Sequence, residues 1–91
     1  MKYTIKATNR FEKDVKQAQK RGKDLDKLFY VIEKLANGEK LEERYHDHSL
    51  VGLYKGCREC HIEPDWLLVY EIFEDVLILS LVRTGSHSDL F

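Results

Sequence analysis

The chain has 91 residues, which is enough for one globular domain over residues 1–91 and too few for two. A hydrophobic share of 43% supports one modest core and excludes a disordered chain, while two cysteines are too few for a disulfide framework and fit a reducing cytosol. No stretch has the apolar length of a transmembrane helix or a signal peptide, so we expect a cytoplasmic protein without a membrane partner.

The formal net charge of −1 conceals a strong asymmetry along the chain. Residues 1–34 contain ten Lys or Arg and five Asp or Glu, whereas residues 35–91 contain five and eleven. A basic surface of this kind attracts phosphate backbones. A pair of solvated helices without any partner is the alternative that charge alone leaves open.

The first half of the chain predicts one strand and two helices. Alternation over residues 3–7 predicts a short strand. Asn9 is expected to cap a helix that ends at residues 21–22, and a helical period predicts a second helix from Asp24 to residue 36. Exposed lysines on the first helix are candidates for binding RNA phosphates: Lys13, Lys16 and Lys20.

The second half of the chain changes to the period of strands. After a polar loop over residues 39–54, strands are predicted at residues 57–62, 67–73 and 76–83, and one helical turn at residues 85–91. This order predicts an α+β fold, in which an N-terminal strand and a helical hairpin pack on a curved antiparallel sheet of about four strands.

Groups that can move protons and hold RNA gather in this second half. Cleaving RNA without a metal requires a base for the 2′-OH and an acid for the leaving 5′-oxygen, and histidine serves as either near neutral pH. Arginine stabilises the charge of the transition state, and aromatic rings stack on unpaired bases. From these residues alone, scattered surface histidines around a core tryptophan are an equally good interpretation. The candidates are His46, His48, His61, His87, Asp65, Trp66, Arg83 and Phe91.

Three segments carry a resemblance to a known family. They are DHSLVG at residues 47–52, RECHIEPDWLLVY at 58–70 and LVRTGSHSDLF at 81–91, and the chain resembles the YafQ branch of the RelE/ParE toxin superfamily in them and over nearly its whole length. The resemblance implies a RelE-like fold and the toxin of a type II toxin–antitoxin system, an endoribonuclease that cuts mRNA in the ribosomal A site. It further implies a cognate antitoxin as partner, contact with operator DNA only through the antitoxin complex, and no metal or cofactor.

The same resemblance selects the site residues, to which we assign roles as a hypothesis. His87 is the expected general acid and Arg83 the phosphate clamp, and the base or its orienting partner is His48, His61 or Asp65. Trp66 and Phe91 are expected to stack on RNA bases. His46 matches no family position, and we interpret it as a solvated loop residue.

Two alternatives compete with this interpretation. A ParE-like toxin would keep the fold and act on DNA gyrase by binding alone. The C-x-x-C-H segment at residues 57–61 matches a haem attachment motif, and Cys57 and Cys60 with His46 and His48 have the ligand types of a zinc site. Residues three apart on a strand face opposite sides, which argues against both metal groups.

Overall fold

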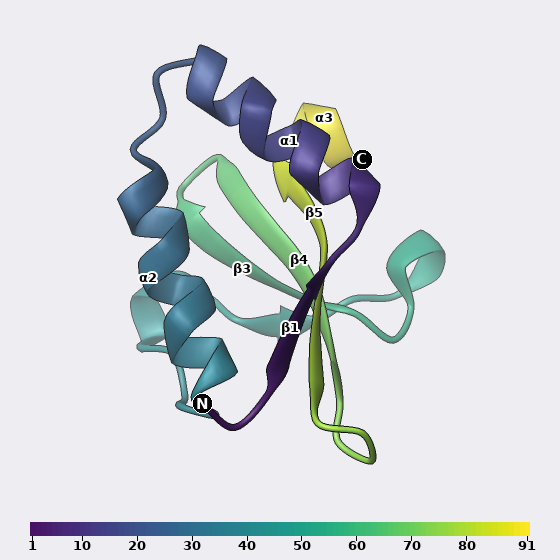
Figure 1. Ribbon diagram of the computed structural model, residues 1–91. Helices are drawn as coiled ribbons and strands as arrows, with labels where there is room; N and C mark the ends of the chain where they lie inside the picture. Colours follow the sequence, from purple (N-terminus) through teal and green to yellow (C-terminus); the bar gives the residue numbers. More distant parts are fainter.

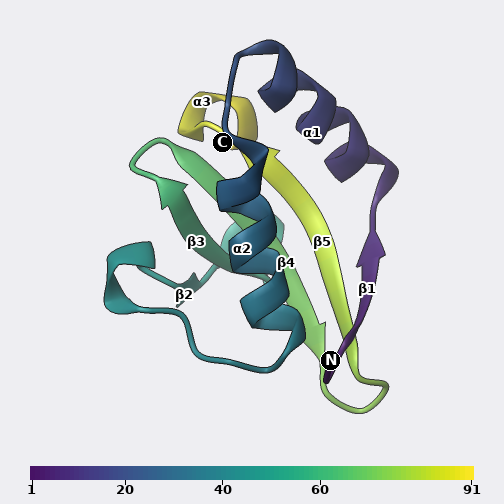
Figure 2. The same ribbon diagram turned by 60° about the vertical axis from the view of Figure 1, so that its left-hand side comes forward.

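The computed structural model describes residues 1–91 as a five-stranded sheet with three α-helices (Figure 1). The strand order across the sheet is β1-β5-β4-β3-β2. Figure 2 shows α2 in front of β3 and β4, and α3 at the end of β5. The elements are β1 (Thr4–Ala7), α1 (Asn9–Lys20), α2 (Leu25–Ala36), the 3₁₀ turn η1 (Glu43–Tyr45), β2 (His48–Ser49), the 3₁₀ turn η2 (Gly52–Tyr54), β3 (Arg58–Glu63), β4 (Trp66–Phe73), β5 (Ile78–Gly85) and α3 (His87–Leu90).

The predicted α+β class and the helical hairpin on a sheet are confirmed, with two differences in the sheet. The sheet is mixed, because β1 pairs in parallel with β5 while the remaining pairs are antiparallel. A fifth strand, β2, lies inside the segment predicted as a polar loop. Two residues are too few to show an alternating pattern, so β2 could not be predicted from the sequence.

The helix boundaries follow their capping residues. The cap of α1 is Thr8 and not Asn9, because the Thr8 hydroxyl accepts a hydrogen bond from the Phe11 amide at 3.0 Å. Asp24 caps α2 as predicted, through a 3.0 Å hydrogen bond from the amide of Asp26. The last strand begins at Ile78, two residues later than predicted, because the hairpin turn before it needs a left-handed residue there, Leu77 with φ 52°.

The sheet buries different amounts of apolar surface on its two faces. The face under α1 and α2 carries a core of 17 buried residues, among them Leu28, Val31 and Tyr70, which we call the helix-side core. The opposite face, which we call the outer face, has a cluster of four buried residues: Cys57, Leu67, Val69 and Leu90. Polar side chains next to this small cluster therefore remain close to solvent. None of the helices is long and apolar enough to span a bilayer.

Candidate active site

Three of the four histidines converge on the outer face. His48 of β2 pairs directly with Glu59 of β3, and His61 follows Glu59 by two residues, so that all three side chains project from one face of the sheet. His87 reaches the same place from the start of α3. The ring centroids of His61 lie 6.4 Å from His48 and 5.8 Å from His87. Folding thus joins groups that are up to 39 positions apart in the sequence.

Glu59 occupies the centre of this cluster and was not among the candidates predicted from the sequence. The residue is only 4% exposed, and its Oε1 atom lies 3.4 Å from His61 Nε2 and 4.0 Å from His48 Nε2. A buried carboxylate needs a donor or a positive partner, and His61 Nε2 is the nearest group of that kind. The sequence signal was available, because Glu59 alternates with His61 on one strand and therefore shares its face.

Hydrogen bonds to pure acceptors orient the rings. His48 Nδ1 lies 2.7 Å from the carbonyl oxygen of His46, and His87 Nδ1 lies 2.8 Å from Asp65 Oδ1. Because neither partner can donate, each Nδ1 carries the proton, and Nε2 is the nitrogen left for a substrate. His61 differs, because its Nδ1 faces the Pro64 carbonyl at 3.3 Å while its Nε2 faces Glu59. Because both nitrogens of His61 face acceptors, these contacts do not select one tautomer of its ring.

A network of side chains holds His87 in place, although it lies close to the C-terminus. Asp65 accepts the backbone N–H of His87 at 2.9 Å as well as its ring nitrogen, and the backbone hydrogen bond above all lowers the pKa of Asp65. Ser86 and Asp89 form a capping box at the start of α3. Arg21 binds Asp89 at 2.6 Å and holds the pKa of that carboxyl well below its usual range. The helical hairpin is thereby tied to the histidine-bearing turn.

Arg83 is positioned by an acid from α1. Its Nε and Nη2 atoms donate to the two carboxylate oxygens of Asp14 at 2.7 and 3.1 Å, and its side chain is 14% exposed. Hydrogen bonding to Asp14 raises the pKa of Arg83, so the guanidinium stays charged. The two residues are 69 positions apart, and nothing in the sequence pattern indicated this pair.

The prediction that Trp66 stacks on RNA is wrong. Trp66 is 1% exposed in the helix-side core, and its indole N–H donates to the hydroxyl of Thr84 at 2.9 Å. The exposed aromatic side chain of this region is Phe91, at 63%, whose ring lies 6.5 Å from His87 and 5.4 Å from Tyr54. Tyr54 was not among the sequence candidates, because it lies in a segment without a strand or helix period.

His46 is exposed, as predicted, but it is not isolated. Its ring lies 5.6 Å from that of His61 in an edge-to-face arrangement. Its backbone is left-handed, with φ 48° and ψ 46°, and its carbonyl accepts the hydrogen bond from His48. His46 therefore contributes to the arrangement of the cluster, which the sequence interpretation as a plain loop residue did not anticipate.

The lysines Lys13, Lys16 and Lys20 are exposed on α1, and none of them forms an ion pair within the chain. Their charges are available to an outside partner. Lys23, at the turn between the two helices, is instead bound to Glu63 at 3.0 Å.

The cysteines do not form a metal or haem site together. Cys60 lies in the helix-side core and Cys57 in the outer cluster, and burial raises the pKa of both thiols. The one group with donor atoms close enough to hold a cation is Glu59, His61 and His87, whose ligand atoms lie within 4.8 Å of one another. This group coincides with the histidine cluster.

The fold and this site define a class of protein, the toxins of bacterial type II toxin–antitoxin systems. A family model described as "Bacterial toxin of type II toxin-antitoxin system, YafQ" matches residues 3–91. The chain belongs to the YafQ family, and its RelE-like fold agrees with the structural relatives.

Three relatives illustrate the similarity. The curated mRNA interferase toxin YafQ of Escherichia coli K12 is 44% identical over 88 residues, covering 96% of this chain and 94% of the relative. YafQ in the crystal structure of the E. coli DinJ–YafQ complex is 43% identical, with a TM-score of 0.90 and 98% of both chains covered. A metal-bound toxin from Helicobacter pylori is 47% identical, with a TM-score of 0.92 and coverage of 98% of this chain and 99% of that one.

Proposed function

We propose that this toxin is a metal-free endoribonuclease that cuts mRNA in the ribosomal A site. The observation that carries the proposal is the cluster of His48, His61 and His87 around the buried carboxylate of Glu59. The name of the E. coli relative, an mRNA interferase toxin, supports the same substrate. The H. pylori toxin binds a metal, but the reaction proposed here uses only protein groups.

The reaction is an attack of the 2′-oxygen on the adjacent phosphorus. A base takes the proton of the 2′-OH, the bond to the 5′-oxygen breaks, and an acid gives that oxygen a proton. The products are a 2′,3′-cyclic phosphate and a 5′-hydroxyl, so no oxidant, water or metal is consumed.

The hydrogen bonds of the cluster support distinct roles. His87 is the acid, because Asp65 fixes its Nδ1–H and leaves Nε2 toward the leaving oxygen. His48 is the base, since its Nδ1–H is bound to the His46 carbonyl and its Nε2 is the free lone pair. His61, whose ring nitrogens face the Pro64 carbonyl and Glu59, positions the Glu59 carboxylate between the acid and the base.

Arg83 and the exposed groups complete the proposed site. The Arg83 nitrogen that makes no hydrogen bond to Asp14 stabilises the transition-state charge. Phe91 and Tyr54 stack on an unpaired base. The lysines of α1 bind ribosomal RNA phosphates, which makes cleavage depend on the ribosome.

A cognate antitoxin is the partner of this toxin, as the solved DinJ–YafQ complex of the relative supports. We expect the antitoxin to bind through an acidic segment that folds as it contacts the α1 lysines or the histidine cluster. Operator DNA is reached only through that complex. A gyrase poison that acts by binding alone has no need of this acid–base cluster, so the nuclease is favoured over the ParE-like alternative.

The test is primer extension on mRNA from cells that briefly express the toxin, followed by cleavage in vitro with and without ribosomes. We expect discrete cuts inside translated codons, much faster on ribosome-bound than on naked mRNA. The rate should be unchanged by 1,10-phenanthroline, which removes transition metals and leaves the Mg²⁺ that ribosomes need. Equal rates on naked and bound mRNA would contradict A-site action, and loss of cleavage in 1,10-phenanthroline would contradict the metal-free mechanism.

A further inference from the structure

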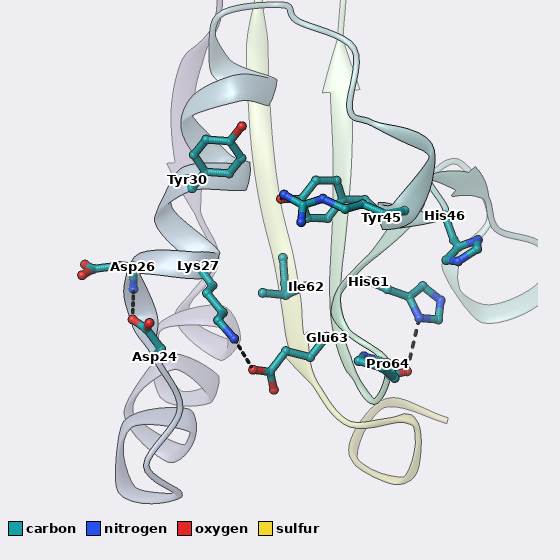
Figure 3. A pocket seen from close by; sticks show the side chains of 11 residues that line it. Asp24, Asp26, Lys27, Tyr30, Tyr45, His46, His61, Ile62, Glu63 and Pro64 are labelled. Atoms are coloured by element: carbon teal, nitrogen blue, oxygen red, sulfur yellow. Dashed lines mark hydrogen bonds and ion pairs between the residues drawn. The ribbon is translucent and has the colours of Figure 1, made fainter.

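A cavity of about 700 Å³ opens between α2 and β3 and is not used by the function proposed above. Figure 3 shows Tyr30 and Lys27 on its α2 side and His46 and His61 on the opposite side, with Ile62 between them. This volume suits a ligand of about the size of one nucleotide. Because His61 belongs to both, the cavity adjoins the histidine cluster.

The lining combines apolar surface with a stacked cation. Ile62 and Tyr45 are buried below the cavity, and Tyr30 is 48% exposed at its edge. The Arg44 guanidinium lies 4.8 Å from the centre of the Tyr45 ring, and 71% of the Arg44 side chain is exposed. Aromatic faces and arginine planes are the surfaces on which proteins hold single-stranded RNA.

The charged side chains at the two ends of the cavity differ. Asp24 and Asp26 lie at the start of α2 and repel a phosphate there. Glu63 is neutralised by Lys23 and Lys27, each 3.0 Å away. A phosphate is favoured at the other end, near His46 and Arg44, whose Nε lies 3.3 Å from Glu42 while its side chain remains exposed, and a base at the α2 end.

On the basis of the proposed nuclease function, we propose that this cavity is a nucleotide-binding subsite for the RNA next to the scissile phosphate. The base lies against Tyr30 and Ile62, and its phosphate lies toward Arg44 and His46. The rings of His46, His61, His87 and Phe91 follow one another at 5.6, 5.8 and 6.5 Å. The subsite and Phe91 therefore hold nucleotides on opposite sides of the cut, and the subsite sets a base preference on its side.

The test compares Arg44→Gln, His46→Ala and Tyr30→Ser with the wild type and with Lys40→Gln, an exposed cation outside the cavity. The substrates are ribosomes programmed with mRNAs that differ by one base on either side of the cut. Wild-type cleavage is measured first, because its absence would refute the proposed function rather than the subsite. Thermal unfolding confirms folding, since Arg44 and Tyr30 also contact Tyr45 and Lys34.

We expect Tyr30→Ser to lower kcat/KM on the preferred codon by about tenfold, the size of one lost base stack, and to flatten the preference at one flanking position. Arg44→Gln and His46→Ala should lower kcat/KM to a similar extent on every codon, because phosphate contacts carry no base preference. Lys40→Gln should behave as the wild type. A base preference within twofold of the wild type in Tyr30→Ser, together with kcat/KM within twofold of the wild type in Arg44→Gln and His46→Ala, would overturn the proposal. So would an intact cleavage pattern with antitoxin affinity reduced more than tenfold, because the cavity would then be an antitoxin surface.

Discussion

The two faces of the sheet hold their side chains by different means. The helix-side core buries 17 residues, and its polar side chains, such as Trp66, are paired inside it. The outer face buries only four residues and carries the histidine cluster, held by hydrogen bonds instead of packing. Substitutions on the first face should therefore act mainly on folding, and substitutions on the second mainly on cleavage.

His87→Ala should have the largest effect. Loss of a positioned acid lowers cleavage by about 10²–10⁴-fold, while the thermal unfolding temperature and antitoxin binding should change little. Rates on an RNA with sulfur in place of the scissile 5′-oxygen check the role, because this leaving group hardly needs a proton. His87→Ala should recover most of its rate there and Arg83→Ala should not. Without that recovery, His87 would be a base or an RNA-positioning residue.

Leu28→Ala tests the other face. Leu28 is fully buried in the helix-side core, so its truncation should cost about 2–5 kcal/mol in the free energy of unfolding. The cleavage rate of the fraction that remains folded should stay near that of the wild type. Urea unfolding and cleavage measured at low temperature check both statements. A specific loss of activity in folded protein would mean that the faces are coupled.

Glu59→Gln probes the polar centre of the outer face. The amide keeps the size of the side chain and removes its charge, so His61 loses its carboxylate partner, and we expect cleavage to fall about 10–100-fold. Single-turnover rates over a range of pH should show the change, and circular dichroism should show an unchanged fold. Wild-type rates at every pH would leave Glu59 with a packing role alone.

Charge reversal of Lys13 and Lys16 to Glu should have a moderate effect confined to association. Both side chains are exposed and without ion pairs, so stability should be unaffected. The rate of antitoxin or ribosome binding should fall several-fold at low salt and less at high salt, because exposed charges are screened. Stopped-flow binding at two ionic strengths measures this. If the binding rates of both the antitoxin and the ribosome are unchanged, the basic face of α1 is excluded as a docking surface.

Lowering the pH should have the smallest effect of all, a weakening of the ion pair between Arg21 and Asp89 that joins the helical hairpin to α3. The pKa of Asp89 is lowered in the fold by Arg21, so this ion pair stabilises the protein fully above the unfolded-state pKa of about 4 and is lost as pH falls through the lower, folded-state value. Asp89→Asn should therefore cost at most about 1 kcal/mol at pH 7, since the pair is near the surface. The difference from the wild type should shrink toward zero at low pH in urea titrations.

Several features of this protein were determined by the sequence alone. The 3.6-residue period and Asp24 predicted α2 to within one residue, because its apolar residues form a single stripe. The three strands of the meander followed from their turns. The motifs also identified His48, His61, Asp65 and His87, which the fold brings to one place.

Only the tertiary structure decided the rest. Every residue from Trp66 to Tyr70 is buried, so the strand has no polar face and its pattern could not tell which way Trp66 points. The parallel pairing of β1 with β5 and the Arg83–Asp14 pair join segments about 70 residues apart. Such contacts depend on how the hairpin packs over the sheet, which no local period records. Glu59 became the centre of the site for the same reason, once β2 paired with β3 and placed His48 opposite it.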